Sequence, residues 1–199
     1  MIPARLALVV PAVLIVLTGC SSTPDTAAPA SATGPDTAVG TPSPLHPGAV
    51  GQPGTPVEVA IPSIGVTSSL MSLGLNADGT VEVPPPEKGM TAGWYTGGAV
   101  PGEAGAAVVI GHNDTRFGKA VFHDLKKITK GADITVTNSR GELARFTVTG
   151  TESVSKDSFP TDKVYGDTED HALRLITCDG DFDADGHPVN NLIVYATLD

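Results

Sequence analysis

The chain has 199 residues and a net charge of −10, from 12 Lys plus Arg against 22 Asp plus Glu, and this length predicts one domain with additional segments. Because basic residues are so few and form no run, the composition gives no electrostatic support for binding nucleic acid or an anionic membrane surface.

The first 20 residues predict an export signal. Residues 1–5 carry one positive charge, residues 6–17 are almost wholly apolar, and Leu-Thr-Gly-Cys occupies residues 17–20. The apolar run is shorter than the roughly 20 residues that a membrane-spanning helix needs. Residues 17–20 also resemble a bacterial lipobox, which implies that Cys20 becomes the lipid-modified first residue of the mature protein. The alternative is a signal in which Cys20 has no role. Either way, we expect the domain to work outside the cytoplasm, membrane-anchored at the cell surface or close to it.

Residues 21–56 predict a disordered linker. Of these 36 residues, 29 are Pro, Gly, Ala, Ser or Thr, and none is aromatic, Lys or Arg. Such a segment buries too little apolar surface to offset the entropy lost on ordering. Its prolines favour an extended tether between the membrane and the domain.

Residues 57–199 predict an all-β domain, either a barrel or a sandwich. Short alternating or apolar runs recur with little helical pattern between them. Residues 120–127 predict one or two helical turns, and Trp94 and Tyr95 are expected to pack in the core or against a pocket. The expected strands cover residues 57–61, 66–70, 80–83, 106–110, 133–138, 142–155, 173–178 and 192–196, with a tight turn between the fifth and the sixth.

Cys178 is the candidate nucleophile. It is the only cysteine in residues 57–199, so it has no partner for a disulfide within the domain. A free thiol in an exported protein is unusual, which favours a functional role. Residues 179–186 are turn-forming throughout, so we expect Cys178 at a junction between a strand and a loop.

An activated thiol needs a base or a cation nearby, and His112 is the best candidate by context. It follows the fully apolar run of residues 106–110, so two neighbouring strands ending at one rim would bring it close to the thiol. We expect His123 to be a surface or packing residue, His171 to be solvated, and His187 to have a structural or substrate-contact role.

Short motifs along residues 57–199, taken in order, resemble sortases of the actinobacterial class F type, from Gram-positive bacteria. They are Ile-Pro-Ser-Ile-Gly-Val at 61–66, Leu-Gly-Leu-Asn-Ala-Asp-Gly at 73–79, Gly-Trp-Tyr at 93–95, Pro-Gly-Glu at 101–103, Gly-His-Asn-Asp at 111–114 and Leu-Ile-Thr-Cys at 175–178.

The resemblance implies a closed eight-stranded β-barrel and a cysteine transpeptidase with no cofactor. Cys178 would attack the Thr carbonyl of a surface protein's Leu-Pro-x-Thr-Gly sorting signal and hold it as a thioester. An amine acceptor, such as a cell-wall precursor, would then resolve the thioester. His112, at the family's histidine position, would be the acid and base.

The chain departs from the family at the arginine expected on the strand after the cysteine, where Val189 stands. Arg116 lies four residues after His112 and could fold back to the site, whereas Arg174 lies about 13 Å from the thiol by strand rise. Asn190, Asn191 or backbone amides are the other candidate donors to the oxyanion. Two further arginines look like surface residues of the hairpin, namely Arg140 and Arg145.

Two other readings and a metal site are less favoured. Asp179, Asp181, Asp183 and Asp185 alternate as in a calcium loop, but the closing Glu of that motif is missing, so we predict no metal. A different Cys/His enzyme of the cell wall, such as an L,D-transpeptidase, would have Ser-x-Gly-Cys at the nucleophile. A catalytically impaired sortase-like barrel that acts as a surface binding lipoprotein is the other alternative, supported by the missing arginine.

Overall fold

A computed structural model describes residues 53–184, 186 and 188–199 of the chain. The predicted signal with Cys20, the linker up to residue 52, Asp185 and His187 lie outside the described residues. The strands are β1 (Pro56–Ile61), β2 (Val66–Leu73), β3 (Ala92–Tyr95), β4 (Gly105–Ile110), β5 (Asp114–Thr115), β6 (Gly118–Lys119), β7 (Asp133–Asn138), β8 (Leu143–Ser155), β9 (His171–Phe182) and β10 (Pro188–Leu198).

Helical structure is short throughout the described residues. The α-helix there is α1 (Thr161–Tyr165), and 3₁₀ turns cover Pro62–Ile64, Pro86–Lys88, Leu125–Lys127 and Lys156–Ser158. No helix in this part of the chain is long and apolar enough to cross a membrane.

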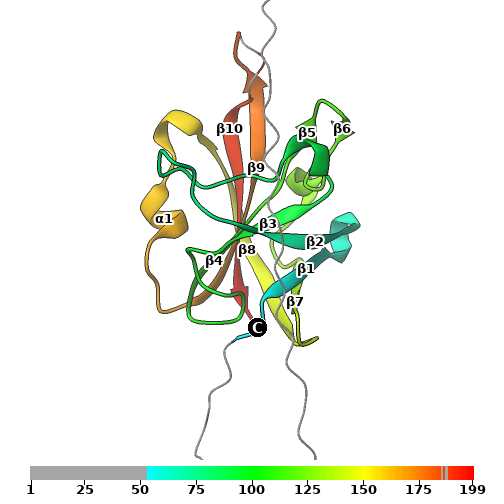
Figure 1. Cartoon of the computed structure of the whole chain (residues 1–199), viewed down its shortest axis with the longest axis vertical. Coiled ribbons are helices and arrows are strands. Elements are labelled where there is room, and N and C mark those ends of the chain that lie inside the picture. The colour runs from blue at the N-terminus through cyan, green and yellow to red at the C-terminus, as the bar shows by residue number, and fades with distance from the viewer. Residues whose placement is uncertain (1–52, 185, 187) are drawn as a thin grey trace, which may run out of the picture. The chain divides into compact units, whose positions relative to one another are not determined.

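In the described residues, eight strands close into a barrel in the order β1-β2-β3-β4-β9-β10-β8-β7, and β5 pairs with β6 separately (Figure 1). The predicted all-β class and closed barrel are therefore confirmed. The pairs β2–β3 and β4–β9 are parallel, and the remaining barrel pairs are antiparallel. A parallel pair runs in the same direction, so the chain that leaves the C-terminal end of β4 comes out beside the middle of β9.

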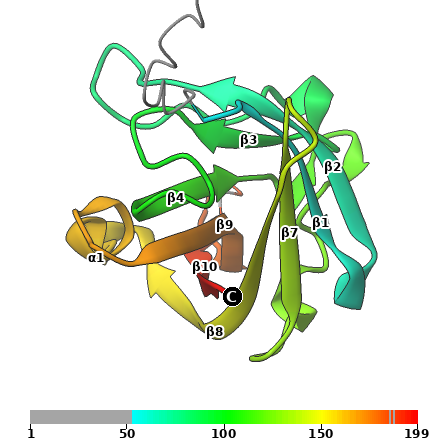
Figure 2. The ribbon, with the colours of Figure 1, turned by 90° about the horizontal axis from the view of Figure 1, so that it is seen from below.

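The sheet buries apolar side chains on both of its faces. Val109, Leu175 and Phe146 belong to the cluster that fills the barrel, whereas Val108 and Ile176 belong to a second cluster on the opposite face. That outer cluster packs against α1, which lies outside the barrel beside β4 (Figure 2). Burial on both faces explains why residues 106–110 are apolar without alternation.

Three local predictions are corrected. Residues 80–83 form no strand but one isolated bridge, from Val81 to Leu75, because prolines 84–86 have no N–H for a ladder. Residues 120–127 form only the 3₁₀ turn at Leu125–Lys127. Strand β9 continues past Cys178 to Phe182, because these turn-prone residues pair with β10 in an exposed hairpin. Cys178 therefore lies within a strand.

Truncating a core leucine should cost far more stability than truncating a surface one. Leu175 in β9 is fully buried, and Leu143 in β8 is 52% exposed. We expect Leu175→Ala to lower the free energy of unfolding by about 3 kcal/mol, because it leaves a cavity. The matched change Leu143→Ala should alter it by less than about 0.5 kcal/mol. Urea unfolding measures both, and equal losses would contradict the assignment of Leu175 to the core.

Candidate active site

The parallel register of β4 and β9 brings His112 next to Cys178. Ile110 pairs with Ile176 at the end of the β4–β9 register, and Gly111 still donates its N–H to the carbonyl of Ile176. His112 and Cys178, 66 positions apart in the sequence, each follow two residues later and line one cavity.

On the other side of Cys178, the antiparallel register with β10 places Asn191 directly opposite the thiol. Successive residues of a strand face opposite sides of the sheet. Asn191 shares the outer face with Ile193 of the outer cluster, while Asn190 shares the face of Leu192, which packs in the barrel. We call His112, Cys178 and Asn191 the row: Cys178 lies in β9, Asn191 lies opposite it in β10, and His112 lies two residues past the end of β4. Asn190 lies outside this row.

All three residues of the row line one cavity of about 680 Å³. Its floor is the outer face of the sheet, and its walls come from the segment between β2 and β3 and from the segment that carries α1. Apolar and aromatic side chains dominate these walls, among them Val81, Phe159 and Tyr165. A half-buried thiol beside such a wall can receive an extended, largely apolar peptide.

Backbone contacts fix the position of His112. Gly111 donates its N–H to the carbonyl of Ile176 at 3.1 Å, and Phe122 donates to the carbonyl of His112 at 2.9 Å. A Cβ on Gly111 would lie only 2.5 Å from the Phe122 ring, so the chain has no room for a larger residue here. This close packing holds the imidazole at the rim.

The His112 ring is also held by the cavity wall. Its Nε2 lies 2.6 Å from the carbonyl oxygen of Pro84, and because a carbonyl only accepts, Nε2 carries the hydrogen. The lone pair of the neutral ring is then on Nδ1. No hydrogen bond joins His112 to Cys178 within the described part of the chain. Such bonds often form only when the substrate is bound.

The wall segment that includes Pro84 is braced at its base. Glu82 accepts a hydrogen bond from the N–H of Gly74 at 2.6 Å. Asp78 accepts from both the hydroxyl and the N–H of Thr80, and these hydrogen bonds hold the pKa of its carboxyl below the ordinary value. These hydrogen bonds give the segment a defined conformation, and it forms one side of the cavity.

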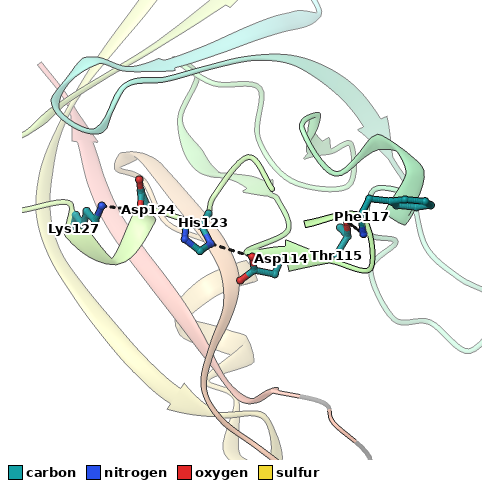
Figure 3. Close-up of polar contacts among 6 residues, drawn as sticks. All are labelled: Asp114, Thr115, Phe117, His123, Asp124 and Lys127. Atoms are coloured by element: carbon teal, nitrogen blue, oxygen red, sulfur yellow. Dashed lines mark hydrogen bonds and ion pairs between the residues drawn. The ribbon is translucent and has the colours of Figure 1, made fainter. Parts of the chain in front are cut away.

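The chain after His112 leads away from the cavity. Asp114 turns toward His123, whose Nδ1 lies 3.1 Å from the carboxylate, and the Phe117 ring points in the opposite direction (Figure 3). Asp124 pairs with Lys127 at 2.9 Å, and this contact lowers the pKa of its carboxyl (Figure 3). His123 does not line the cavity of Cys178.

Comparison with known proteins places the chain in a family. The family model of the sortase domain matches residues 59–199, which is more than half of the chain. The chain belongs to the sortase family. Sortases are cysteine transpeptidases that act outside the cytoplasm on sorting-signal proteins and amine acceptors. No curated protein sequence gives a significant match.

Solved sortase structures share the barrel. The lid mutant of sortase A from Corynebacterium diphtheriae superposes with a TM-score of 0.57 at 20% identity, covering 73% of this chain and 70% of that one. Sortase C-1 from Actinomyces oris gives 0.57 at 21% identity, covering 72% and 73%. Sortase A from Listeria monocytogenes gives 0.54 at 23% identity, covering 72% and 86%. These likenesses support the fold described above.

The arginines of this sortase lie apart from the thiol. Arg116 forms a 2.7 Å ion pair with Glu87, its side chain is 70% exposed, and it does not line the cavity of Cys178. Arg174 packs over the Tyr195 ring at 4.9 Å, and partial burial lowers its pKa. At the predicted arginine position, Val189 is partly exposed and also does not line the cavity.

Sequence reasoning missed several residues of the cavity. The Pro84 carbonyl, Lys156 and Tyr165 belong to no motif that the sequence analysis singled out. The three prolines at 84–86 and the aromatic pair Phe159 and Tyr165 were the only local signals. Closure of the barrel brings these residues to the thiol. Local sequence patterns do not show such tertiary contacts.

Burial of Tyr165 should make the free energy of unfolding of the sortase decrease at alkaline pH. Burial, with a smaller contribution from Tyr95, raises the pKa of Tyr165 from 10.0 to about 12. The neutral phenol therefore stabilises the folded state below pH 10, and this stabilisation is lost between pH 10 and about 12 as the unfolded chain ionises first. Unfolding free energies in urea should fall over that range.

The variant Tyr165→Phe isolates this contribution. It should show a shallower decline in unfolding free energy above pH 10, and its absorbance titration should lack the phenol that ionises last. A wild-type titration in which all three tyrosines ionise near pH 10 would contradict the assignment.

Proposed function

We propose that this sortase cleaves a sorting signal of the Leu-Pro-x-Thr-Gly kind and transfers it to an amine, with Cys178 as the nucleophile and His112 as its acid and base. The observation that carries the proposal is that His112, Cys178 and Asn191 line one cavity, with Asn191 opposite Cys178 in the β9–β10 register and His112 just past the end of β4.

The chemistry follows from the residue types in the row. The thiol of Cys178 gives its proton to Nδ1 of His112, which becomes an imidazolium. The sulfur attacks the Thr carbonyl of the signal, a C–S bond forms, and the carbonyl oxygen takes the negative charge. Collapse of this intermediate breaks the Thr–Gly bond, and the leaving amine takes a proton from the imidazolium of His112. The acceptor amine then gives a proton back to His112, attacks the thioester and releases Cys178.

Asn191 is the proposed side-chain donor to the oxyanion. It stands opposite Cys178 on the same face of the sheet and lines the same cavity, so its amide N–H₂ can donate to the carbonyl oxygen of the carbon that the sulfur attacks. Asn190 faces the other side of the sheet, and Arg116 is bound to Glu87. These placements favour Asn191 among the three candidates.

The finer assignments rest on the sequence motifs. The class F type is supported by the motifs at residues 61–66, 73–79 and 111–114, which follow the family order. The lipobox at residues 17–20 supports an enzyme anchored through lipid-modified Cys20, with the residue 21–56 linker as its tether. Surface proteins bearing the signal would be its substrates, and a cell-wall precursor is a suitable acceptor.

The first experiment mixes the full-length chain with a Leu-Pro-x-Thr-Gly peptide and hydroxylamine and records product masses. We expect a peptide cleaved after Thr and converted to its hydroxamate, because hydroxylamine resolves the thioester. Cys178→Ala and His112→Ala should each lose this product, while His123→Ala, a histidine outside the cavity, should retain it. Absence of turnover across a small library of sorting peptides would favour the binding lipoprotein instead.

The two asparagines give a matched test of oxyanion stabilisation. Asn191→Ala should lower kcat by about 100-fold with little change in KM, because the lost hydrogen bond is made mainly in the transition state. Asn190→Ala removes the same side chain from the other face of the sheet and should change kcat by less than about twofold. Similar effects of both variants would refute the role of Asn191.

A further inference from the structure

One basic residue that belongs to no sequence motif lines the cavity of Cys178. Among the described residues that line it, Lys156 is the one Lys or Arg, and it is exposed to solvent. It begins the 3₁₀ turn Lys156–Ser158, directly after the end of β8.

The sheet register places Lys156 close to the catalytic row. Val154 of β8 pairs with Asn191, and Ser155 pairs with Asn190. Lys156 follows the last residue of β8, at the start of the 3₁₀ turn, and lines the same cavity as Asn191. Only strand β10 separates it from Cys178 in the barrel order. A lysine carries its ammonium on a flexible four-carbon stem, which can cross one strand.

Other cations around the cavity are already engaged. Arg116 is paired with Glu87, Lys163 with Glu152, and Arg174 lies over the Tyr195 ring. For Lys156, by contrast, no ion pair or hydrogen bond is found within the described part of the chain. An ammonium without a carboxylate partner, at the wall of a largely apolar cavity, is available to a negative charge that appears there.

We propose that Lys156 supplies the positive charge of the active site, stabilising negative charge at Cys178 on the thiolate before attack and on the substrate oxyanion afterwards. Ser155, the residue before Lys156, pairs with Asn190, and Asn190 follows Val189, where the family resemblance predicts a cation. The charge would thus come from the turn after β8. The role of Lys156 in turnover rests on the proposed transpeptidation. The presence of its charge near the sulfur does not.

Two alkylating agents of nearly equal size measure this charge without any substrate. Iodoacetate is an anion and iodoacetamide is neutral, so a nearby cation raises the rate ratio of the first to the second at a thiol. The full-length chain is treated with each agent, and the peptide containing Cys178 is quantified by mass so that Cys20 does not contribute. We expect Lys156→Ala to lower the rate ratio about fivefold, and Lys156→Arg to keep it.

Lys163→Ala is the matched control, because Lys163 is a nearby cation that is paired with Glu152 and does not line the cavity. Its rate ratio should equal that of the wild type. An unchanged ratio in Lys156→Ala, or an equal fall in Lys163→Ala, would overturn the inference.

Turnover of the sorting peptide separates this inference from the proposed function. If the peptide is a substrate, Lys156→Ala should lower kcat/KM by about 10- to 100-fold, with recovery in Lys156→Arg. If the alkylation ratio falls in Lys156→Ala but the wild type turns over no sorting peptide, the charge assignment stands and the sorting-signal function fails. Normal kcat/KM in Lys156→Ala would overturn the catalytic part of the inference.

Discussion

The register between the parallel strands β4 and β9 is the constraint on which the rest of the site depends. It is fixed by the core, because Val109 and Leu175 pair with one another and are fully buried inside the barrel. A slip by one residue would turn every side chain of β9 to the opposite face, placing Thr177 on the outer face and Cys178 toward the core. The apolar contacts that stabilise the barrel therefore also determine that the thiol stands beside His112.

The outer face of the sheet, where Cys178 lies, also needs a segment of chain that packs over its apolar residues. Val108, Ile176 and Ile193 would present an apolar patch to solvent if nothing packed on them, and such patches are rare on soluble surfaces. The segment with α1 covers the middle of these strands, with Val164 fully buried against them. Toward the strand ends the cover opens into the cavity. The same connection between β8 and β9 thus stabilises the sheet and shapes the substrate site.

The sequence correctly predicted those elements that depend on local residue patterns. The apolar run at residues 106–110 and the hairpin of β7 and β8 follow from side-chain periodicity and turn chemistry, and the closed barrel followed from the family resemblance. Strand β3 was missed because its glycine-rich surroundings resemble a loop. The end of β9 was placed too early because its pairing with β10 outweighs the turn propensity of residues 179–182. Lys156 was not found, since only the β8–β10 register connects it to Asn191.

The contact between His112 and Pro84 links the imidazole to the cavity wall. As long as the Pro84 carbonyl accepts from Nε2, the position of the wall segment and the orientation of the imidazole are set together. The N–H of Gly74 donates to Glu82 at the base of the segment, and Glu87, within the 3₁₀ turn Pro86–Lys88, pairs with Arg116 at the surface. A shift of the wall would therefore also reorient the imidazole. Arg116, considered from the sequence as an oxyanion donor, instead forms an exposed ion pair with Glu87.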